Sequence, residues 1–477
     1  MKISINNFKS IGSLSNYELR PMTVLSGTNS SGKSSFIQLL LLLKQTIELD
    51  SSKYPLRIVG DYSVKNYLDI IRDKNKSNKL AIGFAIDKSE FEKYGEKIDK
   101  SIFDSFSDYT CTVNLIFDFF GNDIYIKEFL LSYAVPGKAN YVKFIQDKNV
   151  ENSTQIESNN EVFIKSIVDD IPAVYISVNY SAIFPSSVEV IRSEQIENPT
   201  GPLPLINKIK TNEYPDLNPI KSFFRNFFND LYYIGPLRTE PRDFYPNDNK
   251  SDTVGVEGEN VAQILTQRQN EKLKIILPAL DKDPVNYQQV EMTLLDATNA
   301  WMCQIFKFSK KIYAKESGDN YSIILVNQNE IETTIKHVGF GISQVLPIIV
   351  QGLLLQPGST FILEQPEIHL HPKAQSLLFD FLYSLIMRDI NVVIETHSDH
   401  FITRMRRRIA EDETSTLKDK INLTFVEQGA NDLIFKKLDL DDFGVLEYFP
   451  DDFIERPDIE LKALIKAQMK KRIAKKS

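Results

Sequence analysis

Cysteine is scarce in this chain of 477 residues, which contains only two, Cys111 and Cys303. Two cysteines so far apart make neither the framework of a disulfide-stapled domain nor the paired spacing of a zinc site. Hydrophobic runs long enough to cross a bilayer are also missing. The apolar stretch at 345–355 is too short, and it contains Pro347 and Gly352. The N-terminus lacks the apolar core of a signal peptide. We therefore expect a cytoplasmic protein that does not contact a membrane.

Basic residues do not predominate either, since the formal net charge is −8. This balance excludes a protein that coats nucleic acid with its whole surface, but it leaves open a local basic groove. Two stretches are locally basic, the arginines within 404–408 and the tail at 462–476. Each could contact DNA or a partner, or could be the solvated face of a helix.

A glycine-rich segment at 27–34 fits the phosphate-binding pattern G-x-x-x-x-G-K-[ST]. It follows a strand-like run at 22–25 and precedes a helical run at 33–49, as such a loop requires. Backbone N–H groups of the loop and the helix N-terminus surround phosphate oxygens. We expect Lys33 to reach the β- and γ-phosphates of ATP and Ser34 to ligate Mg²⁺. The predicted nucleotide-binding residues here are Gly27, Asn29, Ser30, Gly32, Lys33, Ser34 and Ser35.

An apolar strand at 360–363 ends in an acidic block, 364–367. At the carboxyl edge of a parallel sheet, Glu364 would hold Mg²⁺ through water. The amide of Gln365 cannot accept a proton, although it could orient water. We therefore predict Glu367 as the general base. The glutamine directly after Glu364 leaves slow hydrolysis, or none, as an open alternative.

A second apolar strand, at 391–394, leads into a loop that contains His397. A histidine there can approach the γ-phosphate and sense its loss, so we predict His397 as a catalytic switch residue. Four of the five histidines lie near the acids, which raises a metal cluster as an alternative. His369 and His371, however, are two residues apart before a proline and have the pattern of a turn.

Taken in this order, the motifs resemble the ATP-binding head of ABC-type ATPases, and within that class the SMC/RecF/OLD-like branch. Residues 7–11 are similar to the opening of that branch, and 364–372 to its E-x-P-E-x-H-L-H-P block. The chain further resembles bacterial predicted ATPases with a small C-terminal domain, as found in antiphage defence systems. The segments that carry this second resemblance are 233–238, 258–261, 341–347 and 443–453.

The resemblance implies an α/β fold, an ABC-type P-loop ATPase head in which helices flank a mixed sheet, with a long α+β insertion. It also implies that Ser343, in a glycine-rich bend at 339–344, caps the γ-phosphate bound by a second copy. Two heads would then close around ATP and regulate an effector, such as a nuclease or toxin, in antiphage defence or DNA maintenance. No Toprim-like acidic arrangement follows His397, so a nuclease would be another chain.

The coarse organisation follows from the motifs and from composition. We predict an N-terminal ATPase lobe at 1–135, an inserted helical or irregular subdomain at 136–310, a C-terminal ATPase lobe at 311–410 and a small C-terminal module at 411–477. Residues 136–215 are polar and rich in Asn, Ser and Pro, which favours loops and short elements. Helices are expected at 259–280 and 287–306, and the absence of sustained heptads argues against a long coiled coil.

Three alternatives stay open at this point. ATP could be held as structural glue in a scaffold that hydrolyses little. A transporter ATPase subunit fits less well, because the insertion and the acidic block differ from those of transporters. Arg238, at the end of a predicted strand, could contact phosphate or a second copy of the chain.

Overall fold

The structure is a computed structural model, and it describes residues 1–28, 32–48, 55–60, 62–93, 111–135, 138–148, 153–159, 175–196, 203–212, 218–246, 251–279, 286–430, 432–448 and 450. Asn29 and Ser30, two predicted nucleotide-binding residues, lie outside this described part. The basic tail at 462–476 also lies outside it.

A six-stranded sheet forms the centre of the protein, in the order β12-β19-β20-β3-β21-β22. The first five strands are parallel and β22 is antiparallel to β21. The sheet takes strands from all four predicted segments, whose boundaries stay predictions. Its strands are β3 (Met22–Gly27), β12 (Leu231–Ile234), β19 (Thr360–Glu364), β20 (Asn391–Glu395), β21 (Ile421–Gln428) and β22 (Leu433–Lys437).

The two faces of this sheet pack against two separate hydrophobic cores, as the period of two in a strand requires. Phe361 and Leu363 of β19 belong to one core, whereas Ile362 between them belongs to the other. The first core contains residues of α8 (Phe340–Leu354), α9 (Pro372–Ile386) and α10 (Asp399–Ala410). The second contains residues of α1 (Lys33–Glu48) and α5 (Asn218–Asn229). Each buried Leu, Ile or Phe side chain contributes roughly 1.5–3 kcal/mol to this packing.

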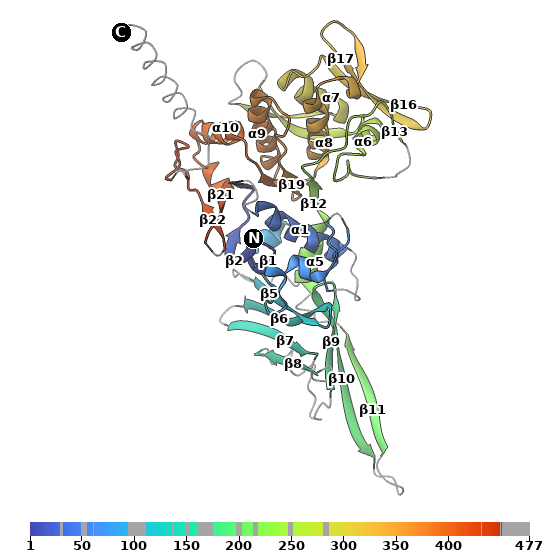
Figure 1. The fold of residues 1–477 in the computed structure, drawn as a ribbon, viewed down its shortest axis with the longest axis vertical. Coiled ribbons are helices and arrows are strands. Elements are labelled where there is room, and N and C mark those ends of the chain that lie inside the picture. The colour runs from blue at the N-terminus through green and yellow to red at the C-terminus, as the bar shows by residue number, and fades with distance from the viewer. Residues whose placement is uncertain are drawn as a thin grey trace, which may run out of the picture.

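An antiparallel sheet of seven strands, β2-β1-β4-β5-β6-β7-β8, lies beside α1 and α5 (Figure 1). A three-stranded sheet, β11-β10-β9, continues from it, and β10 and β11 form the long hairpin at the bottom of the figure. The strands are β1 (Lys2–Phe8), β2 (Ile11–Glu18), β4 (Ala81–Ile86), β5 (Cys111–Phe120), β6 (Asp123–Val135), β7 (Lys138–Asp147), β8 (Ser153–Ser158), β9 (Tyr175–Ser181), β10 (Phe184–Ile196) and β11 (Leu203–Asn212).

The expectation of loops and short elements is therefore wrong for the described residues of 136–215, which form long strands. In β7, Val142 and Phe144 are buried while Tyr141 is exposed and Lys143 half-buried. Polar residues on the outer face of an antiparallel sheet do not interrupt its hydrogen bonds, so a polar composition is compatible with long strands.

The two helices expected at 259–280 and 287–306 are also wrong in part. Helix α6 (Val261–Arg268) ends early, and a hairpin of β14 (Lys272–Pro278) and β15 (Tyr287–Thr293) follows. In β14 the buried side chains of Leu273, Ile275 and Leu277 alternate with more exposed ones, which is the strand period. Helix α7 (Leu294–Asn299) and a π-helical turn (Ala300–Ile305) come after the hairpin.

The remaining elements complete the two groups on either side of the parallel sheet. Helices α6 to α9 lie in the upper group of Figure 1 with a small antiparallel sheet, and α1 and α5 lie below. The small sheet consists of β13 (Tyr245–Pro246), β16 (Lys311–Ser317), β17 (Asn320–Val326) and β18 (Glu332–Thr334). The short helices are α2 (Lys88–Lys93) and 3-10 turns at Tyr67–Ile70, Arg72–Lys74, Ile335–His337 and Lys418–Lys420.

Within the described residues the longest helix is α1, with 16 residues, so no long coiled coil is present there. In that same part of the chain, no helix combines the length and apolar character needed to span a membrane. The prediction of an α/β head with a mixed sheet flanked by helices is confirmed.

Candidate active site

The phosphate-binding segment joins the carboxyl end of β3 to the start of α1. Gly27 has φ +144°, and a Cβ atom there would collide with the carbonyl oxygen of Val426 on β21. Gly32 has φ +79°, and a Cβ atom there would collide with the hydroxyl of Ser10. Both positions therefore need glycine for their backbone angle and for space. Ser35, the next predicted residue, has its hydroxyl 2.7 Å from that of Ser10.

Lys33 lies at the first turn of α1 with its side chain turned back over the loop. Its Nζ donates to the carbonyl oxygens of Thr28 at 2.7 Å and Gly27 at 3.3 Å. Burial lowers the pKa of Lys33, and the nearby charges of Glu395 and Glu367 oppose that shift. Because an anionic phosphate oxygen is a stronger acceptor than a carbonyl, a nucleotide in this loop would attract the ammonium group.

Two glutamates end adjacent parallel strands, and their side chains meet at the P-loop. Glu364 of β19 pairs in register with Glu395 of β20. The Ser34 hydroxyl donates to Oε2 of Glu395 at 2.8 Å, and the Tyr233 hydroxyl donates to Oε1 of Glu364 at 2.8 Å. Burial raises the pKa of Glu364 to about 7, and the charge of Glu395 adds to that shift. The two predicted metal-binding residues, Ser34 and Glu364, are thus brought to one place with Glu395.

Glu367 and His397 are also brought together. The backbone N–H of His397 donates to Oε1 of Glu367 at 2.7 Å. The other carboxylate oxygen, Oε2, is buried and has no hydrogen-bond partner among the described residues. Burial lowers the pKa of His397, as does the charge of Lys33, whereas the Gly27 backbone opposes that shift. The site therefore holds a buried carboxylate with one free oxygen beside a histidine whose neutral form is favoured.

Gln365 occupies the bend between Glu364 and Glu367. Its φ is +43°, and its backbone N–H donates to the carbonyl oxygen of Glu395 at 2.8 Å. The bend turns the chain after the strand, so that Glu367 returns to the site, where it binds the His397 backbone. Gln365 itself is half-buried, whereas Glu367 is 7% exposed.

Ser343 lies in the first turn of α8. Its hydroxyl donates to the carbonyl oxygen of Phe340 at 2.7 Å within its own helix. The start of α8 packs on the loop after the acidic block, where the rings of Phe340 and His369 lie 5.0 Å apart. The role predicted for Ser343 concerns the nucleotide of a second copy and stays a prediction.

The histidine cluster raised as an alternative has no support in the described residues, which contain no group of three or more metal-ligating side chains. His371 instead begins α9, where its Nδ1 accepts from the backbone of Lys373 at 3.3 Å. Mg²⁺ does not need such a group, because it is commonly bound by one or two carboxylates together with phosphates and water. Glu364 and Glu395, together with the Ser34 hydroxyl at the start of α1, fit that ligand set.

Comparison with known proteins identifies the family of the chain. A model of the AAA ATPase domain family matches residues 1–402. The chain belongs to this family. It is an ATPase, and the resemblance expected from its motifs is confirmed. The match stops before β21 and β22, which complete the central sheet of this ATPase.

Three solved structures are similar to the ATPase over 92% of its length. One is an SMC head bound to the C-winged helix domain of ScpA, with 12% identity, TM-score 0.39 and 97% of that chain covered. Another is the SMC head domain from Thermotoga maritima, with 9% identity, TM-score 0.34 and 98% covered. A third is an Smc head with an extended coiled coil bound to the C-terminal domain of ScpA, derived from Pyrococcus furiosus, with 9% identity, TM-score 0.40 and 96% covered. No curated protein matches the chain.

Two residues of this site were missed by sequence reasoning. Glu395 directly follows the apolar run at 391–394 and was assigned no role from the sequence, although it accepts a hydrogen bond from Ser34. The available signal was an acid at the end of an apolar strand, the same signal that identified Glu364. Tyr233 carried no comparable signal, because only the pairing of β12 with β19 brings its hydroxyl to Glu364.

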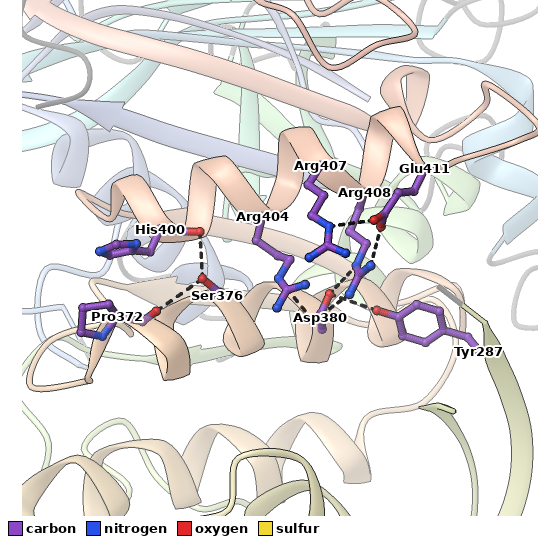
Figure 2. Close-up of polar contacts among 9 residues, drawn as sticks. All are labelled: Tyr287, Pro372, Ser376, Asp380, His400, Arg404, Arg407, Arg408 and Glu411. Atoms are coloured by element: carbon purple, nitrogen blue, oxygen red, sulfur yellow. Dashed lines mark hydrogen bonds and ion pairs between the residues drawn. The ribbon is translucent and has the colours of Figure 1, made fainter. Parts of the chain in front are cut away.

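The arginines of α10, considered above as a possible DNA contact, make contacts within the protein (Figure 2). Arg408 donates to the buried carboxylate of Asp380 on α9 at 2.8 Å and 3.2 Å, and Arg404 lies 3.6 Å from it. Arg407 pairs with Glu411 at 2.7 Å, and Arg406 donates to the carbonyl oxygen of Gly444. These contacts give the basic run a structural role in joining α9, α10 and the segment around 444.

The buried glutamates predict a pH dependence of stability in the protein without nucleotide. The folded-state pKa of Glu364 is raised from 4.5 to about 7, so the folded state holds its proton more tightly than the unfolded state. Its contribution to stability is fully present below the unfolded-state pKa and is lost as pH rises through about 7. We expect the Tm to fall between about pH 5 and about pH 8 more steeply in the wild type than in Glu364→Gln. Equal slopes for the two proteins would contradict this assignment.

Proposed function

We propose that this ATPase binds Mg²⁺ and ATP at the P-loop and hydrolyses the nucleotide with Glu367 as general base. The observation that carries the proposal is the convergence of Glu364, Glu367 and Glu395 on the segment that contains Lys33 and Ser34. Acidic side chains at the carboxyl ends of parallel strands beside a phosphate-binding loop suit metal-assisted phosphoryl transfer.

Each side chain has a distinct task in this proposal. Lys33 binds the β- and γ-phosphate oxygens, and Ser34 with Glu364 and Glu395 holds the metal ion. Mg²⁺, when bound, neutralises charge on the phosphate oxygens. Glu367 accepts a proton from water through its free Oε2, while its Oε1 stays bonded to the His397 backbone. Gln365 orients water without accepting a proton.

The same proposal includes self-association. Two heads close over two ATP molecules, and Ser343 of one copy caps the γ-phosphate bound by the other. Closure then regulates an effector, such as a nuclease or toxin encoded by a neighbouring gene, in bacterial antiphage defence or DNA maintenance. The support for this part is the order of the motifs and their resemblance to the SMC/RecF/OLD-like branch.

The test is to purify the protein with its neighbouring genes in Mg·ATP and to measure its mass by light scattering. For the chain purified alone, we expect a shift from a 54.7 kDa protomer toward twice that mass with ATP. In the preparation made with the neighbouring genes, we expect a stoichiometric partner. Ser343→Ala should weaken the ATP-dependent shift. The matched control is Ser376→Ala, because Ser376 also lies near the start of a helix and donates to a carbonyl of its own helix. Ser376 also lies within hydrogen-bond distance of the His400 carbonyl oxygen, at 3.4 Å.

An unchanged mass with bound ATP would reject the closure of two heads. Equal weakening by the two serine variants would reject the role given to Ser343. DNA-stimulated ATP hydrolysis without any co-purifying protein would favour a stand-alone DNA-maintenance ATPase over an effector complex.

A further inference from the structure

Arg238 follows β12, at the edge of the parallel sheet next to the acidic block. It is 7% exposed, so little of its side chain is accessible to a second copy. Its Nη2 donates to the backbone carbonyl oxygen of Glu364 at 3.3 Å, a long hydrogen bond. Burial lowers the pKa of Arg238 to about 10, so the guanidinium group is still charged at neutral pH. A buried cation with one weak hydrogen bond requires a further explanation.

The other two nitrogens of this guanidinium group, Nε and Nη1, are buried and have no hydrogen-bond partner among the described residues. Leaving a buried charged donor unpaired is costly, and arginine is suited to a bidentate bond with a carboxylate. Oε2 of Glu367 is buried and equally unpaired. The charge of Arg238 lowers the pKa of Glu367 and the charge of Glu367 raises that of Arg238, so the two groups lie close enough to interact.

Unpaired donors and an unpaired acceptor of opposite charge are therefore present after two neighbouring strands, without a hydrogen bond between them among the described residues. Arg238 follows β12 and Glu367 follows the bend after β19, and these strands are neighbours in the sheet. Arg238 already reaches the acidic block, because its Nη2 donates to the Glu364 carbonyl oxygen. Catalytic hydrogen bonds are often long or poorly aligned in an enzyme without substrate and tighten only when the substrate binds.

We propose that Arg238 is a positioning residue that acts through Glu367. When nucleotide is bound, Arg238 donates to one lone pair of Oε2, and the other lone pair of that oxygen faces the attacking water. This inference rests on the proposed role of Glu367 as general base. It assigns to Arg238 neither a contact with a second copy nor a direct contact with phosphate, the two alternatives that the sequence left open.

A double-mutant cycle tests the proposal. Arg238→Met should lower kcat by about 10- to 100-fold, with the Kd for ATP changed by less than about threefold. Arg238→Lys keeps the charge but loses the planar set of N–H donors, so its kcat should lie between those of Arg238→Met and the wild type. In a Glu367→Gln background, Arg238→Met should cause almost no further loss, because the group through which it acts is already absent.

Arg388→Met is the matched control. Arg388 is another partly buried arginine, but its guanidinium donates to the backbone carbonyls of Gly352, Leu353 and Leu355, at the end of α8. This variant should lower the Tm without the selective loss of kcat. Losses from Arg238→Met and Glu367→Gln that multiply in the double variant would overturn the proposal, as would a weakened Kd for ATP in Arg238→Met. An unchanged kcat in Glu367→Gln alone would instead reject the proposed general base.

Discussion

Replacing Glu367 with glutamine is expected to lower kcat for ATP hydrolysis by about 10²- to 10⁴-fold while ATP stays bound. Glutamine has nearly the same shape, and its side-chain oxygen can still accept the hydrogen bond that the His397 backbone donates to Glu367 at 2.7 Å. What it loses is the basic oxygen, Oε2, which has no partner among the described residues. The measurement is single-turnover hydrolysis together with the Kd for ATP.

Gln365→Ala is the internal control for this prediction, because Gln365 lies in the same bend. If Glu367 is the base, removing the Gln365 amide should change kcat by less than about tenfold, as expected for a group that only orients water. The opposite pattern, a fast Glu367→Gln and a large gain on Gln365→Glu, would show that the base position is 365. Negligible hydrolysis by the wild type, with stoichiometric ATP binding, would favour the scaffold function.

Replacing Asp380 with asparagine is expected to destabilise the protein by about 3–5 kcal/mol. Asp380 is fully buried, and its carboxylate receives hydrogen bonds from Arg408 and from the Tyr287 hydroxyl (Figure 2). Asparagine keeps the shape but removes the charge, which leaves the buried guanidinium of Arg408 without its carboxylate partner on α9. The measurement is the midpoint of denaturant unfolding without nucleotide.

Two further variants test whether the loss of stability comes from leaving a buried charge unpaired. Arg407→Ala removes an exposed ion pair with Glu411 on the same helix and should cost only about 0.5 kcal/mol. The double variant Asp380→Leu/Arg408→Met should recover part of the loss, because it removes both buried charges together but leaves the Tyr287 hydroxyl without its acceptor. A single Asp380→Asn variant as stable as Arg407→Ala would contradict the role assigned to this carboxylate.

The sequence predicted those parts of the site whose residues are close together along the chain. The P-loop, the strand that ends at Glu364 and the strand before His397 each combine an apolar run with a distinctive polar ending, and these elements occur where expected. The hydrogen bond between Ser34 and Glu395 joins residues 361 positions apart. It forms because of the order of the strands in the sheet, which no short stretch of sequence predicts. The placement of Tyr233 and Arg238 depends in the same way on β12 pairing with β19.

The errors have a related cause. The hairpin of β14 and β15 was expected to be helical, because its apolar residues fit more than one period over a short window. Its strand pairing, from Lys272 opposite Thr293 to Pro278 opposite Tyr287, decides between the two periods. In 136–215, composition favoured loops, but partner strands supply the hydrogen bonds that stabilise an extended backbone there.

The position of β3 in the sheet has a consequence for how the protein is made. This strand is synthesised long before both of its neighbours, β20 and β21. Its backbone donors and acceptors therefore lack their sheet partners while the long segment between them is synthesised. Pairings between such distant segments form slowly, and exposed strand edges invite aggregation in the meantime. Nucleotide-binding capacity should consequently emerge only after β20 and β21 have cleared the exit tunnel.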